Sequence, residues 1–270
     1  MEKNSLYTKE RNENDMSFMH QVDKSTIPVV DILGVHIAAI NMPWLVDFTR
    51  EHVHELSGDY ICVSNVHTTV TSGEDATYRN IQNGGIMAIP DGGPLSSVGR
   101  KRGALNMERT TGPSYMGEIM KISAEHGYSH YFYGSTQETL DKLRVNLMRD
   151  YPGIQIAGMY SPPFRPLSDE EDLKIVEEIN AAEPDFIWVG LGAPKQEKWM
   201  ANHQGRVKGL MVGVGAAFDY YAENIKRAPE WMQKANLEWL YRLLQDPKRL
   251  FKRYLVTNTK FVWNVMIRGK

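Results

Sequence analysis

Short runs rich in β-branched and aromatic residues alternate with segments of helical periodicity along most of the chain. The strand-like runs cover 60–64, 85–90, 128–133, 154–159, 185–191 and 209–215, and the helix-like segments cover 66–83, 93–102, 113–126, 136–150, 169–182 and 195–203. Two shorter strand-like runs flank Gly34 and precede a helical segment at 42–56. Strands that alternate with helices form βαβ units with parallel strands. The sequence therefore predicts an α/β fold, a Rossmann-like, mostly parallel sheet with helices on both faces.

The alternation stops near residues 224–229, and the charge of the chain changes sign there. Residues 226–270 hold eleven Lys and Arg against three Asp and Glu, a net charge of +8, whereas residues 1–225 hold twenty against thirty, a net charge of −10. Apolar and aromatic residues recur in the basic segment at mostly helical spacings. We therefore expect a flexible polar leader over 1–27, an α/β domain over 28–224 and a basic helical appendage over 225–270.

A surface that is both basic and aromatic suits an anionic membrane interface. The longest apolar stretch, at 210–218, is about half of what a spanning helix needs, so no transmembrane helix is predicted. The polar N-terminus lacks the apolar region of a signal peptide, and the only cysteine, Cys62, lies in a strand-like run. These features predict a cytoplasmic protein that associates peripherally with an anionic membrane surface.

Polar residues and glycines follow the predicted strands, where an open parallel sheet binds its ligands. They are Asn65, Asp91, Gly134, Ser135, Gly190, Gly192, Pro194, Lys195, Gln196, Glu197, Gly213, Gly215 and Asp219. Glycines at such turns let backbone amides approach a phosphate, so a nucleotide diphosphate would fit. Both Gly-x-Gly pairs lack the third glycine of a dinucleotide fingerprint, and a plain tight turn explains each pair equally well.

Asp91 lies in a Pro-Asp-Gly-Gly turn directly after an apolar strand. A partly desolvated carboxylate at this place could act as a general base, because burial raises its pKa toward neutrality. Spacing alone favours the alternative that Asp91 caps the next helix.

The pair His126 and His130 has the spacing of a helical zinc site. Gly127 lies between the two histidines and is expected to end a helix. His126 is then at the C-terminus of that helix, and His130 is in the next strand. The chain also has no Asp-x-Asp motif. We expect no metal and no cofactor, and therefore assign neutralisation of a diphosphate to arginines. The candidates are Arg109, Arg242, Arg249 and Arg253.

Several blocks, taken together, resemble one family. They are Pro90-Asp91-Gly92, Tyr151-Pro152-Gly153, the Gly-x-Gly-x-Pro-Lys-Gln-Glu block at 190–197, the block at 212–219, Lys226-Arg227-Ala228-Pro229 and the Glu-Trp-Leu-Tyr-Arg-Leu block at 238–243. In order and spacing they resemble the WecG/TagA/CpsF glycosyltransferases, glycosyltransferase family 26, over about residues 28 to 255.

The resemblance implies an inverting transfer of a sugar from a UDP donor to an undecaprenyl-diphosphate-linked saccharide, in bacterial cell-surface polysaccharide or teichoic acid synthesis. It places this reaction at the inner, cytoplasmic face of the cell membrane. It implies that Asp91 is the catalytic base, that Asn65 and Arg109 line the active site, and that Gln196 helps to hold the donor. The remaining donor-binding residues are then Gly134, Ser135, Gly190, Gly192, Pro194, Lys195, Glu197 and Asp219. Val63 stands where the family often has a threonine, which bears on sugar preference.

In this family the tail is an appendage near the active site. The resemblance and the charge pattern together predict that Arg242, Arg249 and Arg253 face the UDP diphosphate. The same segment is expected to meet lipid through Lys248, Lys252, Phe251, Tyr254, Phe261 and Trp263.

Two alternatives are a nucleotide-dependent Rossmann oxidoreductase and a nucleic-acid-binding protein acting through the basic tail. The acidic main body argues against nucleic acid. The sequence identifies neither the sugar nor the acceptor saccharide, and it leaves open whether the chain forms a homo-oligomer.

Overall fold

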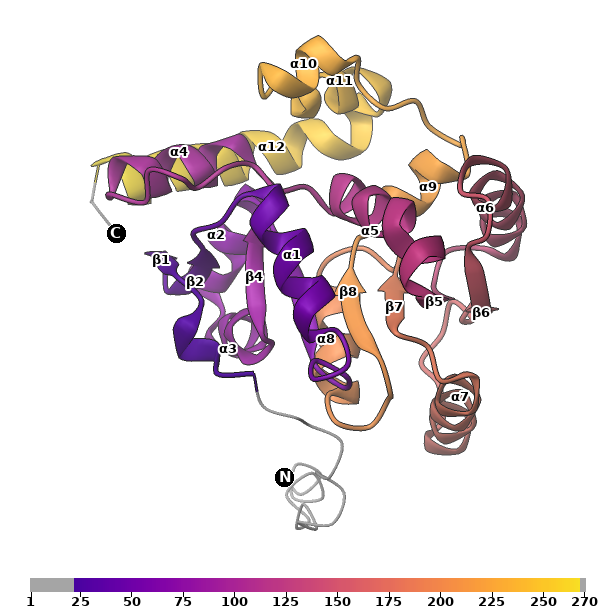
Figure 1. The fold of residues 1–270 in the computed structure, drawn as a ribbon. Helices are drawn as coiled ribbons and strands as arrows, with labels where there is room; N and C mark the ends of the chain where they lie inside the picture. The colour runs from indigo at the N-terminus through magenta and orange to yellow at the C-terminus, as the bar shows by residue number, and fades with distance from the viewer. Residues whose placement is uncertain (1–21, 268–270) are drawn as a thin grey trace, which may run out of the picture.

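A computed structural model describes residues 22–267, without the side chains of Arg249 and Met266, and its centre is one eight-stranded sheet (Figure 1). The strand order is β1-β2-β4-β3-β8-β7-β5-β6, and every neighbouring pair is parallel except β1 and β2. The strands are β1 (Val29–Ile32), β2 (Val35–Ala38), β3 (Tyr60–Ser64), β4 (Met87–Pro90), β5 (Ser129–Tyr133), β6 (Gln155–Tyr160), β7 (Phe186–Val189) and β8 (Leu210–Gly213). The predicted mostly parallel sheet is confirmed.

Helices cover both faces of this sheet, as predicted. In β7, Trp188 packs on one face and Ile187 on the other, and both side chains are fully buried. One face is covered mainly by α1 (Met42–His52), α5 (Gly112–His126), α6 (Gln137–Asp150) and α9 (Ala217–Tyr221). The other is covered mainly by α2 (Val66–Glu74), α4 (Gly93–Lys101), α7 (Asp169–Ala182) and α8 (Lys195–His203).

The single helix predicted over 66–83 is wrong, because the chain forms two helices there, α2 and α3 (Ala76–Gly84). Asp75 ends the first helix in an extended conformation, and its carboxylate caps the second by accepting a hydrogen bond from the Tyr78 amide at 3.1 Å. A short polar residue that competes with the helical backbone favours such a break.

The histidines lie as the spacing argument predicted. His126 is in the last turn of α5, before the left-handed Gly127, and His130 is in β5. His130 is buried, with its ring nitrogens 2.8 Å from the Ser123 hydroxyl and 3.1 Å from the Trp188 indole nitrogen. Burial lowers the pKa of His130 to about 3, so it is a neutral residue of the core.

The basic C-terminal segment forms a helical appendage of α10 (Glu230–Lys234), α11 (Glu238–Gln245), α12 (Pro247–Phe261) and a π-helical turn η3 (Val262–Ile267). It lies beyond the carboxyl ends of the central strands (Figure 1). Helix α12 packs on α2, where Thr257 and Phe261 are buried and Lys260 forms an ion pair with Glu74 at 2.6 Å.

Most of the predicted leader lies outside the described residues. Its described end contains a short 3-10 helix, η2 (Lys24–Thr26), and Ile27 is buried in the core. The Lys24 ammonium donates hydrogen bonds to the carbonyl oxygens of Asn83 and Gly85. Residues 22–27 therefore pack against the α/β domain.

Candidate active site

A cavity of about 890 Å³ opens at the carboxyl ends of the four central strands, β4, β3, β8 and β7. The helices that follow the neighbouring strands β3 and β8, α2 and α9, lie on opposite faces of the sheet, and this leaves between them the crevice where such folds bind ligands. The appendage forms the opposite wall. Of the site residues predicted from the sequence, the lining includes Asn65, Asp91, Arg109, Gly190, Gly192, Gln196, Asp219, Arg242 and Arg253.

Five other predicted residues do not line this cavity. Gly134 and Ser135 follow β5, which lies one strand further out than β7. Pro194 and Lys195 are exposed at the start of α8, and Glu197 is completely buried beneath it. Their roles in donor binding stay predictions. Arg249 lies in α12, but its side chain is outside the described structure.

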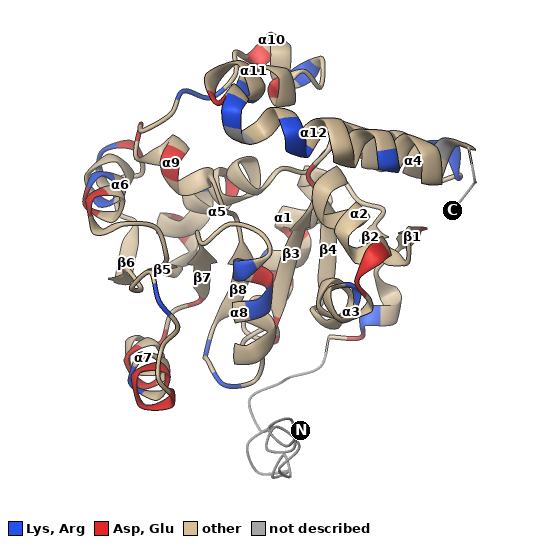
Figure 2. Cartoon of the chain, turned by 180° about the vertical axis from the view of Figure 1, so that it is seen from behind, with Lys and Arg blue, Asp and Glu red and all other residues tan. Residues whose placement is uncertain are grey.

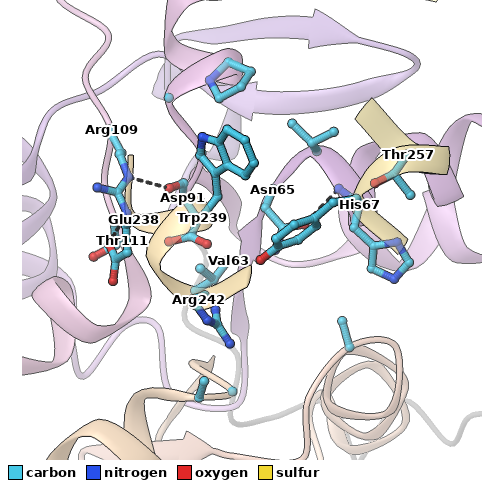
Figure 3. A pocket seen from close by; sticks show the side chains of 18 of the residues that line it. Val63, Asn65, His67, Asp91, Arg109, Thr111, Glu238, Trp239, Arg242 and Thr257 are labelled. Carbon is cyan, nitrogen blue, oxygen red and sulfur yellow. Dashed lines mark hydrogen bonds and ion pairs between the residues drawn. The ribbon is translucent and has the colours of Figure 1, made fainter. Parts of the chain in front are cut away.

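Asp91 is a half-buried carboxylate that faces the cavity (Figure 3). The alternative that it caps the following helix is wrong, because Gly92 is the N-cap of α4 and has no side chain to accept a bond. Burial raises the pKa of Asp91, and the charge of Glu238 raises it further, while Arg109, Arg242 and Arg227 oppose these effects. A carboxylate with a raised pKa, placed in a cleft, is suited to proton abstraction.

Arg109 joins the loop of Asp91 to the appendage. Its Nε donates to the Asp91 backbone carbonyl at 3.0 Å, and the rest of the guanidinium contacts the Gln233 carbonyl at 3.3 Å and the Glu238 carboxylate. Glu238 also accepts from Arg227 Nε at 3.5 Å. We call Arg109, Arg227 and Glu238 the latch. The resemblance pointed to Arg109 as an active-site residue and included Arg227 and Glu238 in its blocks, but it did not show that Glu238 pairs with both arginines.

Asn65 uses one end of its amide for the fold. Its Oδ1 accepts from the amides of His67 and Thr68, at 3.0 and 3.2 Å, and so caps α2. Its Nδ2 is then the group that can donate to a ligand, since the residue lines the cavity.

Three cavity-lining residues carry buried polar atoms without a hydrogen-bond partner among residues 22–267. They are the Tyr220 hydroxyl, His67 Nδ1 and Arg253 Nε. The sequence did not single out Tyr220. Arg242 lies 5.9 Å from the centre of the Tyr220 ring and has no ion pair within the described chain. Buried polar atoms without partners are rare in folded proteins. Their gathering around one cavity indicates a place for a polar ligand.

Gln196 holds the two glycine-rich turns together. Its Nε2 donates to the Gly213 carbonyl at 2.9 Å, and its Oε1 accepts from the Gly192 amide at 3.0 Å. The side chain is buried, and its amide also donates to Glu197 at 2.9 Å. Gln196 thus fixes the wall of the cavity, while its predicted contact with the donor stays a prediction.

The sequence profile described as the glycosyl transferase WecG/TagA/CpsF family matches residues 30–270. The chain belongs to this family. It is 28% identical over 217 residues to the N-acetylglucosaminyldiphosphoundecaprenol N-acetyl-beta-D-mannosaminyltransferase of Bacillus subtilis (strain 168), covering 80% of this chain and 82% of the relative. To the enzyme of the same name from Staphylococcus aureus (strain MW2) it is 29% identical over 234 residues, covering 84% and 89%. The glycosyltransferase prediction is therefore confirmed against the oxidoreductase and nucleic-acid alternatives.

The glycosyltransferase has no group of three or more His, Cys, Asp or Glu side chains within residues 22–267 that could hold a metal ion. Whether transfer proceeds without a metal stays a prediction. In the same part of the chain, no helix combines the length and apolar character needed to cross a membrane.

The appendage of the glycosyltransferase has many apolar side chains that are exposed to solvent. Among the described residues, nine of the fifteen exposed large hydrophobic side chains belong to it, including Phe251, Leu255 and Trp263. Lys and Arg residues lie along α11 and α12, at the opposite end of the molecule from the acidic α7 (Figure 2). The predicted lipid contact of Phe261 is wrong, since its side chain is buried against the core. Tyr254 is half-buried and lines the cavity, and its lipid contact stays a prediction.

Proposed function

We propose that the chain transfers a sugar from a UDP donor, with inversion, to an undecaprenyl-diphosphate-linked saccharide. The observation that carries the proposal is Asp91, a half-buried carboxylate with a raised pKa in a cavity bordered by glycine-rich turns and arginines. The two curated relatives are named for transfer of N-acetylmannosamine to N-acetylglucosaminyldiphosphoundecaprenol. An N-acetylmannosamine donor is the first to test. Val63, which lines the cavity in place of the family's usual threonine, is a reason to test the corresponding uronic acid and glucose as well.

In the proposed reaction the donor diphosphate lies against the turns after β7 and β8, at Gly190, Gly192 and Gly215. The acceptor hydroxyl approaches the opposite face of the anomeric carbon, and Asp91 takes its proton as the new glycosidic bond forms. The bond to UDP breaks on the other face. Arg242 and the Tyr220 hydroxyl are placed to offset the charge that develops on the departing diphosphate.

Replacing Asp91 with Asn tests the base. The variant keeps the shape of the side chain but cannot accept the proton, so turnover should fall by roughly 10²-fold or more while UDP binding stays within about twofold. The assay is release of UDP with and without lipid acceptor, run with and without a chelator. In the unmodified protein, activity should decline as pH falls through the raised pKa of Asp91, above the usual aspartate range near 4. Unchanged turnover in Asp91→Asn would remove the assignment.

We also propose that the outer face of α12 binds the anionic inner membrane surface. This face presents Lys248, Phe251, Lys252 and Leu255, all exposed. Each Lys or Arg near an anionic surface contributes about 1 kcal/mol to binding. Together with insertion of the apolar side chains into the membrane interface, this is enough for reversible attachment.

Replacing both Phe251 and Leu255 with Asp should abolish sedimentation with vesicles that contain anionic lipid. The matched control replaces Val145 and Met148, which are equally exposed on α6, with Asp. Equal losses in the two double variants would show that the effect is general charge, and would refute a specific membrane surface on α12.

A further inference from the structure

The reaction proposed above involves two diphosphates, one in the donor and one in the lipid-linked acceptor. The cavity likewise has two regions that each contain an arginine side chain. Arg242 lies over Tyr220, and its charge acts on Asp91. Arg253 of α12 and His67 of α2 line the cavity from two helices that pack together, and burial and the charge of Arg253 lower the pKa of that imidazole. The second region is built from α2 and α12, whereas the glycine-rich turns follow β7 and β8.

His67 and Arg253 each carry a buried nitrogen without a hydrogen-bond partner among the described residues, Nδ1 and Nε respectively. His67 is fixed in the first turn of α2, where its amide donates to Asn65 Oδ1 at 3.0 Å. No carboxylate within residues 22–267 forms an ion pair with Arg253, which packs instead near the Tyr254 ring. A partly buried guanidinium without a counter-ion is costly unless a ligand supplies the anion.

We propose that His67 and Arg253 form a second anion subsite, which binds the diphosphate of the lipid-linked acceptor. Arg253 Nε–H donates to a phosphate oxygen, and His67 donates from Nδ1 in the tautomer that carries its proton there. Burial and the charge of Arg253 lower the pKa of His67, which favours its neutral form. Arg253 therefore supplies the positive charge of the subsite.

The position of the subsite favours the acceptor over the donor. His67 and Thr257 lie toward one side of the cavity, with Asp91 and Arg109 toward the other and Asn65 between them (Figure 3). The lining also includes apolar side chains of α4 and α12, among them Val98 and Phe261. Helix α12 carries exposed Phe251, Leu255 and Val256 outside the cavity. A polyprenyl chain leaving this end of the cavity would therefore meet an apolar surface.

This inference rests on the proposed function, and its test is kinetic. With a short-chain, soluble polyprenyl-diphosphate acceptor, His67→Ala and Arg253→Gln should each raise KM for the acceptor roughly 10-fold or more. Donor KM and kcat should stay within about twofold. His54→Ala and Arg144→Gln are matched controls, because both residues are exposed and lie outside the cavity. Unchanged melting temperatures establish that the variants fold.

Two further measurements show which diphosphate the subsite binds. An apolar glycoside of the acceptor sugar, which has no phosphate, should react equally well with the two variants and the unmodified protein. UDP alone should bind all of them with equal affinity in calorimetry. If His67→Ala weakens UDP binding and leaves the acceptor KM unchanged, the subsite belongs to the donor and the proposal is overturned.

The subsite and the proposed function can fail separately. If no sugar is transferred to any lipid acceptor, the proposed function fails, and binding of the same soluble polyprenyl-diphosphate acceptor still tests the subsite. A 10-fold loss of that binding in both variants supports it, and equal binding overturns it. A double variant whose loss is smaller than the product of the two single losses indicates that both side chains hold one group.

Discussion

Replacing Glu238 with Gln tests whether the latch holds the appendage over the active site. Glu238 joins Arg109 of the α/β domain to Arg227 of the segment that leads into the appendage. The side chains of Glu238 and Arg109 are only 9% and 19% exposed. The substitution preserves size and one acceptor oxygen, but leaves two poorly solvated guanidinium groups without a counter-ion.

Removing one partner of a buried ion pair costs about 3–5 kcal/mol. The remaining amide oxygen can still accept one bond, and the contact with Arg227 is long at 3.5 Å, so we expect about 2–3 kcal/mol, below that range. This corresponds to a shift of roughly 30- to 150-fold in the equilibrium between docked and undocked appendage. The control is Glu230→Gln, because Glu230 pairs with Lys234 at 79% and 76% exposure, where solvent screens the two charges and the pair contributes little to stability.

Hydrogen exchange of amides in α10 and α11 measures undocking directly. Glu238→Gln should accelerate exchange by the stated factor, and trypsin should cut faster at Lys226 and Arg227. The pH profile gives an independent readout. Since the charge of Glu238 raises the pKa of Asp91, its removal should move the acid limb of activity to lower pH. If amides of α10 and α11 exchange at the same rate in Glu238→Gln and Glu230→Gln, and the acid limb of the activity profile stays at the same pH, the latch is refuted.

Two further substitutions test how the walls of the cavity are held. A Cβ on Gly93 would lie 2.6 Å from the Asn236 side-chain oxygen, so Gly93→Ala should loosen the appendage and accelerate its proteolysis. Gly92→Ala, where the nearest atom would be 3.7 Å away, should not, and equal rates in the two would contradict the steric argument. Gln196→Ala leaves the Gly213 carbonyl and its other partners unpaired, a loss of about 2–3 kcal/mol that should lower the melting temperature by roughly 5–10 °C. An unchanged melting temperature would show that Gln196 does not hold the turns.

Local pattern was enough to predict most elements. The predicted strand at 60–64 and the predicted helices at 169–182 and 195–203 have the bounds observed for β3, α7 and α8. An apolar run marks β3, a capping box precedes α7, and a turn with a proline precedes α8. All three signals act over a few residues. The break at Asp75 was missed because helical periodicity continues on both sides of it.

The candidate site was predictable only in part. Residues at strand ends, such as Asp91 and Asn65, could be found because parallel strands bring their carboxyl ends to one edge. Gly134 and Ser135 fall outside the cavity because strand order, which local pattern does not give, places β5 beyond β7. Phe261 was expected at the membrane because an apolar residue on a helix does not reveal which of two surfaces it meets.

By itself, the sequence determined the alternating elements, the segregation of charge and the family. The tertiary structure decided which distant groups meet. Arg109 and Glu238 are 129 positions apart, and His67 and Arg253 line one cavity only because α12 packs on α2. The physical reason is that periodicity and capping act within a turn or two of the chain, whereas the pairing of buried charges depends on packing between whole elements.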